Sequence, residues 1–203
     1  MTPHNFTWKK LNSSELTRVY LEEMRRDFPP SELKPLSMIL NSEAEGTAHT
    51  WGVYEEGAMV AYLLMVQPAG CSVSQLDYFS VLPAYRNGGI GAGLLAALPA
   101  HEEGADAIII EAECPEKAED KAMALRRLGF YARCGAKDTG WEEHLFDAWF
   151  RVLVLPTGGR EPEAGQAVEA LADCYRRVMG PDKWHKHVRF YRPEGGAAQP
   201  KSI

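Results

Sequence analysis

The chain is poor in cysteine and shows none of the spacings that cysteine-dependent folds require. Its four cysteines, Cys71, Cys114, Cys134 and Cys174, form no C-x-x-C pair and follow no regular spacing. This pattern argues against a disulfide framework and against a zinc site, so we expect reduced thiols and no metal.

The sequence also lacks an excess of basic residues and a long apolar run. Its 22 basic residues are outnumbered by 28 acidic ones, which gives a formal charge of −6. Nucleic acid is therefore not the expected partner, because domains that bind it usually carry a basic stripe. The longest apolar run, residues 58–66, is too short to cross a bilayer, and the first ten residues contain no apolar signal core. We expect a cytoplasmic protein without a membrane partner.

Two common phosphate-binding sequences are missing as well. No Gly-Lys-Ser/Thr triplet occurs, so the chain has no Walker loop. A Rossmann loop needs G-x-G-x-x-G, and Leu94 stands where the third glycine would be. Glu111 and Glu113 do follow at about twenty residues, as the Rossmann acidic residue would. A dinucleotide-binding enzyme is therefore kept only as an alternative.

What the sequence does contain is a strand, a glycine-rich turn and a helix in direct succession. Residues 75–81 predict a strand, because they are rich in aromatic and β-branched residues, and Leu82-Pro83 ends it. A glycine-rich turn at residues 86–91 follows, and the leucines of 94–98 then fall on one helical face. Backbone N–H groups at such a turn, with the helix dipole behind them, favour a phosphate or pyrophosphate. The alternative is a tight turn whose glycines only satisfy backbone geometry.

The spacing P-x-x-R-x-x-G-x-G over residues 83–91 resembles the pyrophosphate loop of the acetyl-CoA-dependent N-acetyltransferase (GNAT) superfamily. Further on, Ile110-Glu111-Ala112 resembles the next strand of that family. Residues 126–135 resemble its following helix, with Tyr131 four residues before the last glycine. The motifs occur in the family's order and at its spacing, and the resemblance covers residues 6–155.

The resemblance implies a mixed α/β fold of GNAT type. Its central, mostly antiparallel sheet contains a splayed pair of parallel strands and is flanked by helices. We expect the acetyltransferase domain at residues 1–156, and a linker, a C-terminal helix and a flexible tail at residues 157–203. This extension is expected to pack on the domain or on a second subunit, which leaves a homodimer open. We do not expect it to take part in catalysis.

Local signals predict the individual elements. Asn12-Ser13-Ser14 offers an N-cap, and Phe28-Pro29-Pro30 stops the helix that follows. Strands are expected at residues 6–11, 47–54, 58–66, 75–81, 107–113 and 141–155. Further helices are expected at residues 31–40, 90–103, 115–133 and 164–178, and the histidines of 184–187 are expected in a solvated segment.

The resemblance also implies how the cofactor, acetyl-CoA, is held. Backbone N–H groups of the loop would bind the pyrophosphate, and a free N–H near Phe79 would hydrogen-bond the thioester carbonyl. Such a donor stabilises the oxyanion that develops during acyl transfer. The cofactor-binding residues implied are Phe79, Val81, Arg86, Asn87, Gly88, Gly89, Gly91 and Ala92.

Deprotonating an ammonium group requires a carboxylate or a water relay. By resemblance, Glu111 occupies the position of a glutamate that acts as base in some members of the family. Asp77 and Glu113 are rival bases, and for all three the alternative is a plain surface carboxylate. Tyr131 matches the tyrosine that protonates the departing thiolate, the alternative being a half-buried helix tyrosine.

The expected activity is transfer of an acetyl group from acetyl-CoA to a primary amine of a small molecule or peptide, by direct attack in a ternary complex. A catalytically silent acyl-CoA-binding or regulatory module is the alternative. On the acceptor side the resemblance implies Phe28 and Glu32, although Glu32 also suits a first helical turn. Two departures from the family leave the acceptor open. Ala136 replaces an aromatic residue, and residues 114–117 replace a stretch that contains asparagine.

Overall fold

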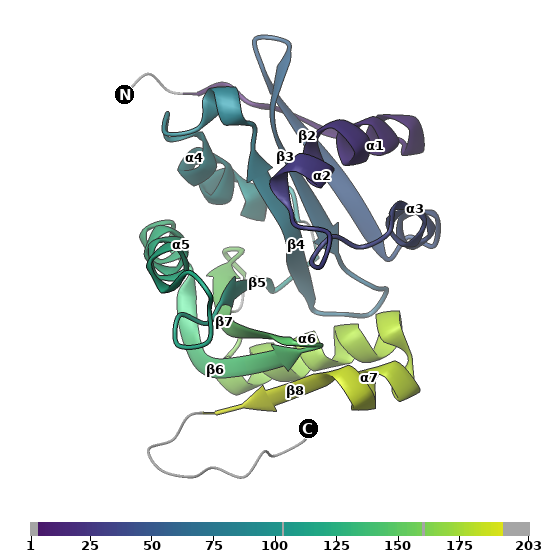
Figure 1. The fold of residues 1–203 in the computed structure, drawn as a ribbon, viewed down its shortest axis with the longest axis vertical. Helices are drawn as coiled ribbons and strands as arrows, with labels where there is room; N and C mark the ends of the chain where they lie inside the picture. Colours follow the sequence, from purple (N-terminus) through teal and green to yellow (C-terminus); the bar gives the residue numbers. More distant parts are fainter. Residues whose placement is uncertain (1–3, 103, 160, 193–203) are drawn as a thin grey trace. The chain divides into compact units, whose positions relative to one another are not determined.

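The computed structural model describes residues 4–102, 104–159 and 161–192, which fold as two compact units (Figure 1). The first unit contains the chain up to Ala69 together with Leu76–Leu94. The second contains Gly70–Gln75 and the chain from Leu95 onward. Strand β4, Val73–Val81, contributes to both, because its first three residues are counted with the second unit.

Strand order confirms the predicted fold class. The first unit has the order β1-β2-β3-β4, and the second continues from the start of β4 as β4-β5-β7-β6-β8. Among the described residues the sheet is mostly antiparallel, with β4 and β5 as its parallel pair. This is the mixed α/β architecture expected from the sequence. The splaying of the parallel pair stays a prediction.

The first unit places its helices beside an antiparallel sheet. Its strands are β1 Thr7–Lys10, β2 Ala48–Glu55, β3 Ala58–Val66 and most of β4. Its helices are α1 Ser13–Val19, a π-helical segment Tyr20–Met24, α2 Arg25–Asp27, α3 Leu36–Ala44, a 3₁₀ turn Pro83–Tyr85 and the start of α4 Ile90–Ala97. Apolar residues of α1 and α3, such as Leu16 and Ile39, pack with Tyr62 and Leu64 of β3.

The predicted cap of the first helix is confirmed. Asn12 Oδ1 accepts hydrogen bonds from the N–H groups of Ser14 and Glu15, both at 3.0 Å. Glu15 in turn accepts from the Asn12 N–H, so a complete capping box starts the helix. Helical backbone then continues through α2 to Asp27, and Phe28 is extended, as expected before two prolines.

Two predicted helices of this region have the wrong limits. α3 begins at Leu36 rather than at residue 31, because the backbone at Pro35 is extended, with ψ at 140°. Glu32 therefore lies in the preceding turn and not in a first helical turn. α4 ends at Ala97 rather than near residue 103, and Leu98–Ala100 continues as a 3₁₀ turn, because Pro99 has no N–H for the α-helical pattern.

The second unit packs one long helix on an antiparallel sheet. After the start of β4, its strands are β5 Ala107–Glu113, β6 Lys137–Leu145, β7 Ala148–Pro156 and β8 Val188–Tyr191. Its helices are α5 Lys121–Arg133, α6 Ala164–Met179 and α7 Pro181–His187. The apolar face of α6, including Val168 and Leu171, is buried with Ile109 of β5 and Val152 and Val154 of β7.

Two further limits also differ from the prediction. α5 begins at Lys121 and not at Pro115, because Asp120 is the residue that caps it, accepting from the Met123 N–H at 2.9 Å. The single strand expected at residues 141–155 is a hairpin of β6 and β7 that turns at Phe146, where φ is 52°.

The chain beyond residue 178 is more regular than expected from the sequence. α7 contains both histidines of 184–187, and β8 pairs antiparallel with β6, with Val188 opposite Leu145. The tail expected in the last ten residues lies outside the described residues. The domain boundary near residue 156 stays a prediction. No helix within the described ranges is long and apolar enough to cross a membrane.

Candidate active site

The glycine-rich loop lies in the first unit, between a 3₁₀ turn and helix α4. Asn87 and Gly89 have positive φ angles of 67° and 84°, a region that suits glycine and that asparagine tolerates. The Gly93 N–H donates to the Gly89 carbonyl at 3.1 Å, so Gly89 is the N-cap residue of α4. The N–H groups of residues 90–92 consequently have no acceptor inside the helix. No acidic side chain occurs in residues 86–92, so these donors suit a phosphate.

The N-terminal segment packs against this loop. The imidazole of His4 lies between two acceptors, with Nδ1 2.8 Å from Glu55 Oε1 and Nε2 3.2 Å from the Gly88 carbonyl oxygen. The hydrogen bond to Glu55, followed by that to Gly88, raises the pKa of His4. The His4 ring stacks on Phe6 at 5.1 Å, and a Cβ at Gly93 would lie 3.2 Å from the Phe6 ring. Gly93 therefore permits a close approach of helix α4 to Phe6.

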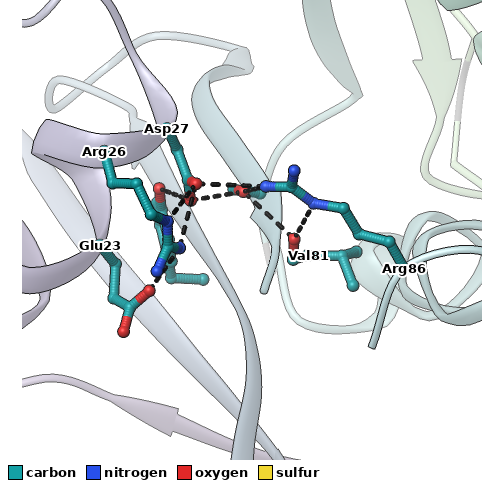
Figure 2. Close-up of polar contacts among 7 residues, drawn as sticks. Glu23, Arg26, Asp27, Val81 and Arg86 are labelled. Carbon is teal, nitrogen blue, oxygen red and sulfur yellow. Dashed lines mark hydrogen bonds and ion pairs between the residues drawn. The ribbon is translucent and has the colours of Figure 1, made fainter. Parts of the chain in front are cut away.

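The Arg86 side chain is bound by protein groups (Figure 2). Its Nε donates to the Val81 carbonyl at 2.8 Å, and its Nη2 donates to Asp27 Oδ1 at 3.2 Å. The guanidinium therefore joins the start of the loop to the end of α2. Its contribution to a phosphate site, as the structure stands, is through the backbone that it positions.

Asp27 is the acceptor around which these contacts gather. Its side chain is 5% exposed, and its Oδ2 accepts from the Tyr62 hydroxyl at 2.9 Å and the Ser80 hydroxyl at 2.8 Å. Its Oδ1 accepts from Arg26 Nε at 3.1 Å as well as from Arg86. Burial alone would raise the pKa of Asp27, but the bonds from Ser80, Tyr62 and Arg26 outweigh it and lower that pKa. Sequence reasoning missed Asp27, because no motif marks it.

Phe79 and Val81 lie on β4, where successive N–H groups alternate in direction. The Leu82 N–H donates to the Val60 carbonyl of β3 at 2.9 Å. The N–H groups of Phe79 and Val81 therefore point to the other edge of β4, where the Val81 carbonyl accepts from Arg86. The thioester donor near Phe79 stays a prediction.

The residues predicted for the acceptor side meet around Tyr78. The Phe28 ring contacts the Tyr78 ring edge-on at 4.9 Å, and the Tyr78 hydroxyl donates to the Glu32 carbonyl at 2.8 Å. Lys34 donates its N–H to the same hydroxyl and pairs through Nζ with Asp77 at 2.6 Å. Glu32 thus contributes its backbone while its side chain is exposed. Asp77, one of the candidate bases, has a cationic partner.

Glu111, in the second unit, binds two neutral donors. Its Oε1 accepts from the Tyr175 hydroxyl of α6 at 2.6 Å, and its Oε2 accepts from the Gln75 side-chain amide. Gln75 also donates to the Tyr175 hydroxyl at 3.0 Å. Sequence reasoning missed Gln75 and Tyr175, since they are a hundred residues apart and neither belongs to a motif.

A second carboxyl group, Glu143 of β6, lies against Glu111. It is 0% exposed, and among the described residues neither of its oxygens receives a hydrogen bond. Burial, then the charge of Glu111, raises the pKa of Glu143 well above its ordinary value. Burial and the neighbouring carboxylate therefore both favour the protonated form of Glu143. Its burial was not predictable from its neighbours in the chain, because Glu142 and His144 on either side of it are polar.

The other two chemical candidates of the second unit are Glu113 and Tyr131. Glu113 Oε2 lies 3.6 Å from Arg127 Nη1 of α5, so this carboxylate also has a cationic partner. Tyr131 is half-buried on α5, and its ring lies 5.3 Å from that of Phe130. Burial raises the pKa of Tyr131 to about 12, so its hydroxyl stays protonated at neutral pH.

One cluster in the second unit has metal-binding residue types. Single ligand atoms of Cys114, Glu116 and Glu142 lie within 4.8 Å of one another. Arg151 Nη2, however, lies 3.7 Å from Glu116 and 3.6 Å from Glu142. The positive charge that these carboxylates require is therefore already supplied by a side chain.

Residues 46–135 match the family model described as an acetyltransferase (GNAT) domain. The matched stretch contains the glycine loop, Glu111 and Tyr131. No curated protein sequence gives a significant match to the chain.

Solved structures of the same fold include three whose chains are covered almost completely. A Bacteroides thetaiotaomicron protein assigned to the GNAT family superposes with a TM-score of 0.65 at 19% identity, covering 85% of this chain and 97% of its own. The Escherichia coli ribosomal-protein-S18-alanine N-acetyltransferase superposes with a TM-score of 0.56 at 18% identity, and the match covers 75% of this chain and 94% of that enzyme. The Vibrio cholerae spermidine N-acetyltransferase, in complex with CoA and spermine, superposes with a TM-score of 0.56 at 9% identity, and the match covers 80% of this chain and 98% of that enzyme. At these identities the likeness is one of fold.

These findings confirm the fold and the family resemblance expected from the sequence. The matched domain model also supports the expected enzyme class, since it describes an acetyltransferase of the GNAT type, whose cofactor is acetyl-CoA. The individual site residues, the acceptor and the compartment stay predictions.

Proposed function

We propose that the chain transfers an acetyl group from acetyl-CoA to a primary amine of a small molecule or peptide, by direct attack in a ternary complex; the match of residues 46–135 to the acetyltransferase (GNAT) domain model supports this. The glycine loop carries this proposal. It presents successive backbone donors at the start of α4, it has no acidic side chain, and it lies inside the matched stretch. The net charge of −6 also fits a cationic amine.

The loop fits the cofactor's pyrophosphate by the chemistry of its donors. Residues 88–92 would hold it through N–H groups, while Arg86 and His4 fix the loop from either side. When bound, acetyl-CoA supplies an activated thioester. The Phe79 N–H, which points away from β3, is the proposed donor to its carbonyl oxygen.

Glu111 is the proposed general base, and its rivals are less suitable. Asp77 pairs with Lys34 at 2.6 Å and Glu113 with Arg127 at 3.6 Å. A carboxylate that is already paired with a cationic side chain is less available to a substrate ammonium group. Within the described residues Glu111 has no such partner, and its contacts are the Tyr175 phenol, the Gln75 amide and the carboxyl of Glu143.

Tyr131 is the proposed acid for the departing thiolate. Its raised pKa keeps the proton on the phenol, which can donate a hydrogen bond to a leaving sulfur. A phenol with a pKa of about 12 is a weaker acid than an ordinary thiol, for which about 8.5 is typical. Its contribution is therefore hydrogen-bond donation to the developing thiolate, because full transfer of the phenol proton to that sulfur would be uphill.

An acceptor screen tests the proposal. Release of the CoA thiol would be followed with acetyl-CoA and a panel of polyamines, aminoglycosides, amino acids and peptides with free N-termini. Two arms follow from proteins of this fold, one named for spermidine and one for the alanine of ribosomal protein S18. Turnover with at least one amine is expected. Thermal stabilisation by CoA without turnover on any amine would instead identify a silent acyl-CoA-binding module.

A further inference from the structure

A cluster of four polar side chains lies among apolar core residues in the second unit. We call Gln75, Glu111, Glu143 and Tyr175 the Glu111 cluster. They come from β4, β5, β6 and α6, and the core around them contains buried apolar residues, including Ile109 and Val152 of the sheet and Leu171 of α6. A polar group in such a place needs hydrogen bonds to offset its desolvation.

Three members of the Glu111 cluster satisfy one another. Tyr175 and Gln75 each donate to a different oxygen of Glu111, and Gln75 donates to the Tyr175 hydroxyl at 3.0 Å. Glu143 is the exception, because its fully buried carboxyl receives no hydrogen bond from the described residues. Ionised, it would be a second negative charge beside Glu111 without a donor, which is strongly unfavourable. Protonated, it has both a proton to give and an acceptor, Glu111, against it.

We propose that Glu111 and Glu143 share one proton, which Glu143 holds and donates to Glu111, and that Tyr175 and Gln75 position Glu111 to exchange protons. The catalytic meaning of this pair rests on the proposed function, in which Glu111 is the general base. The shared proton itself does not depend on that function.

The proton balance of the step is simple. The pair starts with one proton and a charge of −1, and a substrate ammonium group gives its N–H proton to Glu111. The amine becomes neutral and its lone pair is free to attack, while the pair becomes two neutral acids. The proton then leaves to water, which restores the starting charge. In this scheme Tyr175, Gln75 and Glu143 are positioning residues, because they act through Glu111.

Among the described residues, Glu111 is the charged group that interacts with Glu143, and no cation is paired with it. Glu111 in turn contacts the phenol of Tyr175 from α6 and the amide of Gln75 from β4. Its neighbours in register on β7 and β8 are Phe150 and Phe190.

Tyr175 also gives the C-terminal extension a part in the site. It is 7% exposed and packs in the core formed by α6, with Trp184 of α7 stacked 6.4 Å away. The only route by which α6 touches the proposed base, among the described contacts, is this phenol. Helix α6 was not expected to take part in catalysis, and the inference assigns it a positioning role.

The shared proton is tested by carbon-13 NMR of glutamate carboxyl groups in the full chain at neutral pH. One glutamate of the wild type should show the chemical shift of a protonated carboxyl, and this signal should vanish in Glu143→Gln and Glu143→Leu. If every glutamate of the wild type is ionised, the proposal is overturned. Because leucine suits an apolar site and glutamine matches the shape of glutamate, at least one folded variant is expected.

The positioning role is tested by the pH profile of kcat/KM with an amine found in the acceptor screen. Tyr175→Phe and Glu143→Leu each remove a donor to ionised Glu111, so the acidic limb should move up by about one pH unit. Glu143→Gln keeps an N–H donor and should restore that limb. An unmoved limb in Tyr175→Phe and Glu143→Leu would overturn the positioning role. If no amine is acetylated, the proposed function fails, and the NMR result still decides the shared proton.

Discussion

Arg86 Nη2 lies 3.2 Å from Asp27 Oδ1, and this contact ties the first residue of the glycine loop to the end of helix α2. The two partners are unequal, because Asp27 is 5% exposed and Arg86 is 48% exposed. An exposed cation contributes little to stability, whereas a buried carboxylate with several donors contributes much. The contact therefore holds the glycine loop in place and adds little to the stability of the fold.

This inequality predicts different effects for the two residues. Asp27→Asn should lower the free energy of unfolding by about 2–4 kcal/mol, because an amide cannot accept from all the donors and Arg26 keeps only Glu23 of its two carboxylate partners. Arg86→Gln should lower it by less than about 1 kcal/mol, yet raise the KM for acetyl-CoA. Denaturant unfolding and steady-state kinetics measure the two quantities. If Arg86→Gln lowered the free energy of unfolding as much as Asp27→Asn does, Arg86 would contribute to the stability of the fold as strongly as Asp27.

The glycine loop predicts selective stabilisation by one cofactor. CoA or acetyl-CoA should raise the melting temperature, whereas NAD and ATP should not, because the loop completes neither a Rossmann nor a Walker sequence. Gly89→Glu should abolish the shift, since it places a negative charge at the start of α4. Gly46→Glu is the matched control, because Gly46 also has a positive φ, 70°, and an added Cβ there meets nothing within 4 Å. Equal stabilisation by NAD would contradict the assignment.

Local signals predicted the parts of the site that lie close together in the chain. The cap at Asn12, the stop before Phe28 and the loop around Gly89 all depend on neighbours within a few residues. Helix limits failed where a proline or a cap acted a few positions further on, as at Pro35 and Asp120.

The partners of these residues were not predictable in the same way. Gln75 and Tyr175 meet across 100 positions, and Asp27 meets Ser80 across 53. Hydrogen bonds of this kind follow from how strands and helices pack, and no periodicity or short motif encodes them. Glu143 shows the limit most clearly, since its neighbours in sequence are polar while its side chain is fully buried.

The Tyr131 hydroxyl should matter for turnover but not for cofactor binding. Tyr131→Phe removes only the hydroxyl, so kcat and kcat/KM should fall in parallel while the CoA-induced melting shift is kept. General acid catalysis contributes roughly 10²–10⁴-fold, and the weak acidity of this phenol favours about 10²-fold. Tyr54→Phe is the control, because Tyr54 is another half-buried phenol, on β2. An unchanged kcat with chemistry rate-limiting would make Tyr131 a packing residue.

Glu143 predicts a pH dependence of stability with a definite sign. Its pKa in the folded chain lies well above its ordinary value of 4.5, so the folded state binds a proton that the unfolded state releases above that pH. The stability that this proton provides is complete below pH 4.5 and is lost as the pH rises toward the folded-state pKa. In that window the wild type should lose about 1.4 kcal/mol per pH unit through this group alone. Glu143→Gln carries no titrating proton and should lack this loss.

The measurement is the difference in unfolding free energy between Glu143→Gln and the wild type, taken by denaturant titration from pH 4 to pH 8. The difference removes the titrating groups that do not interact with Glu143, because they are common to both chains. The difference should grow in favour of the glutamine variant as the pH rises, because only the wild type must either keep a proton or bury a second charge beside Glu111. A difference that stays constant over this range would mean that Glu143 is ionised in the folded chain, and that a donor reaches it which the described residues do not supply.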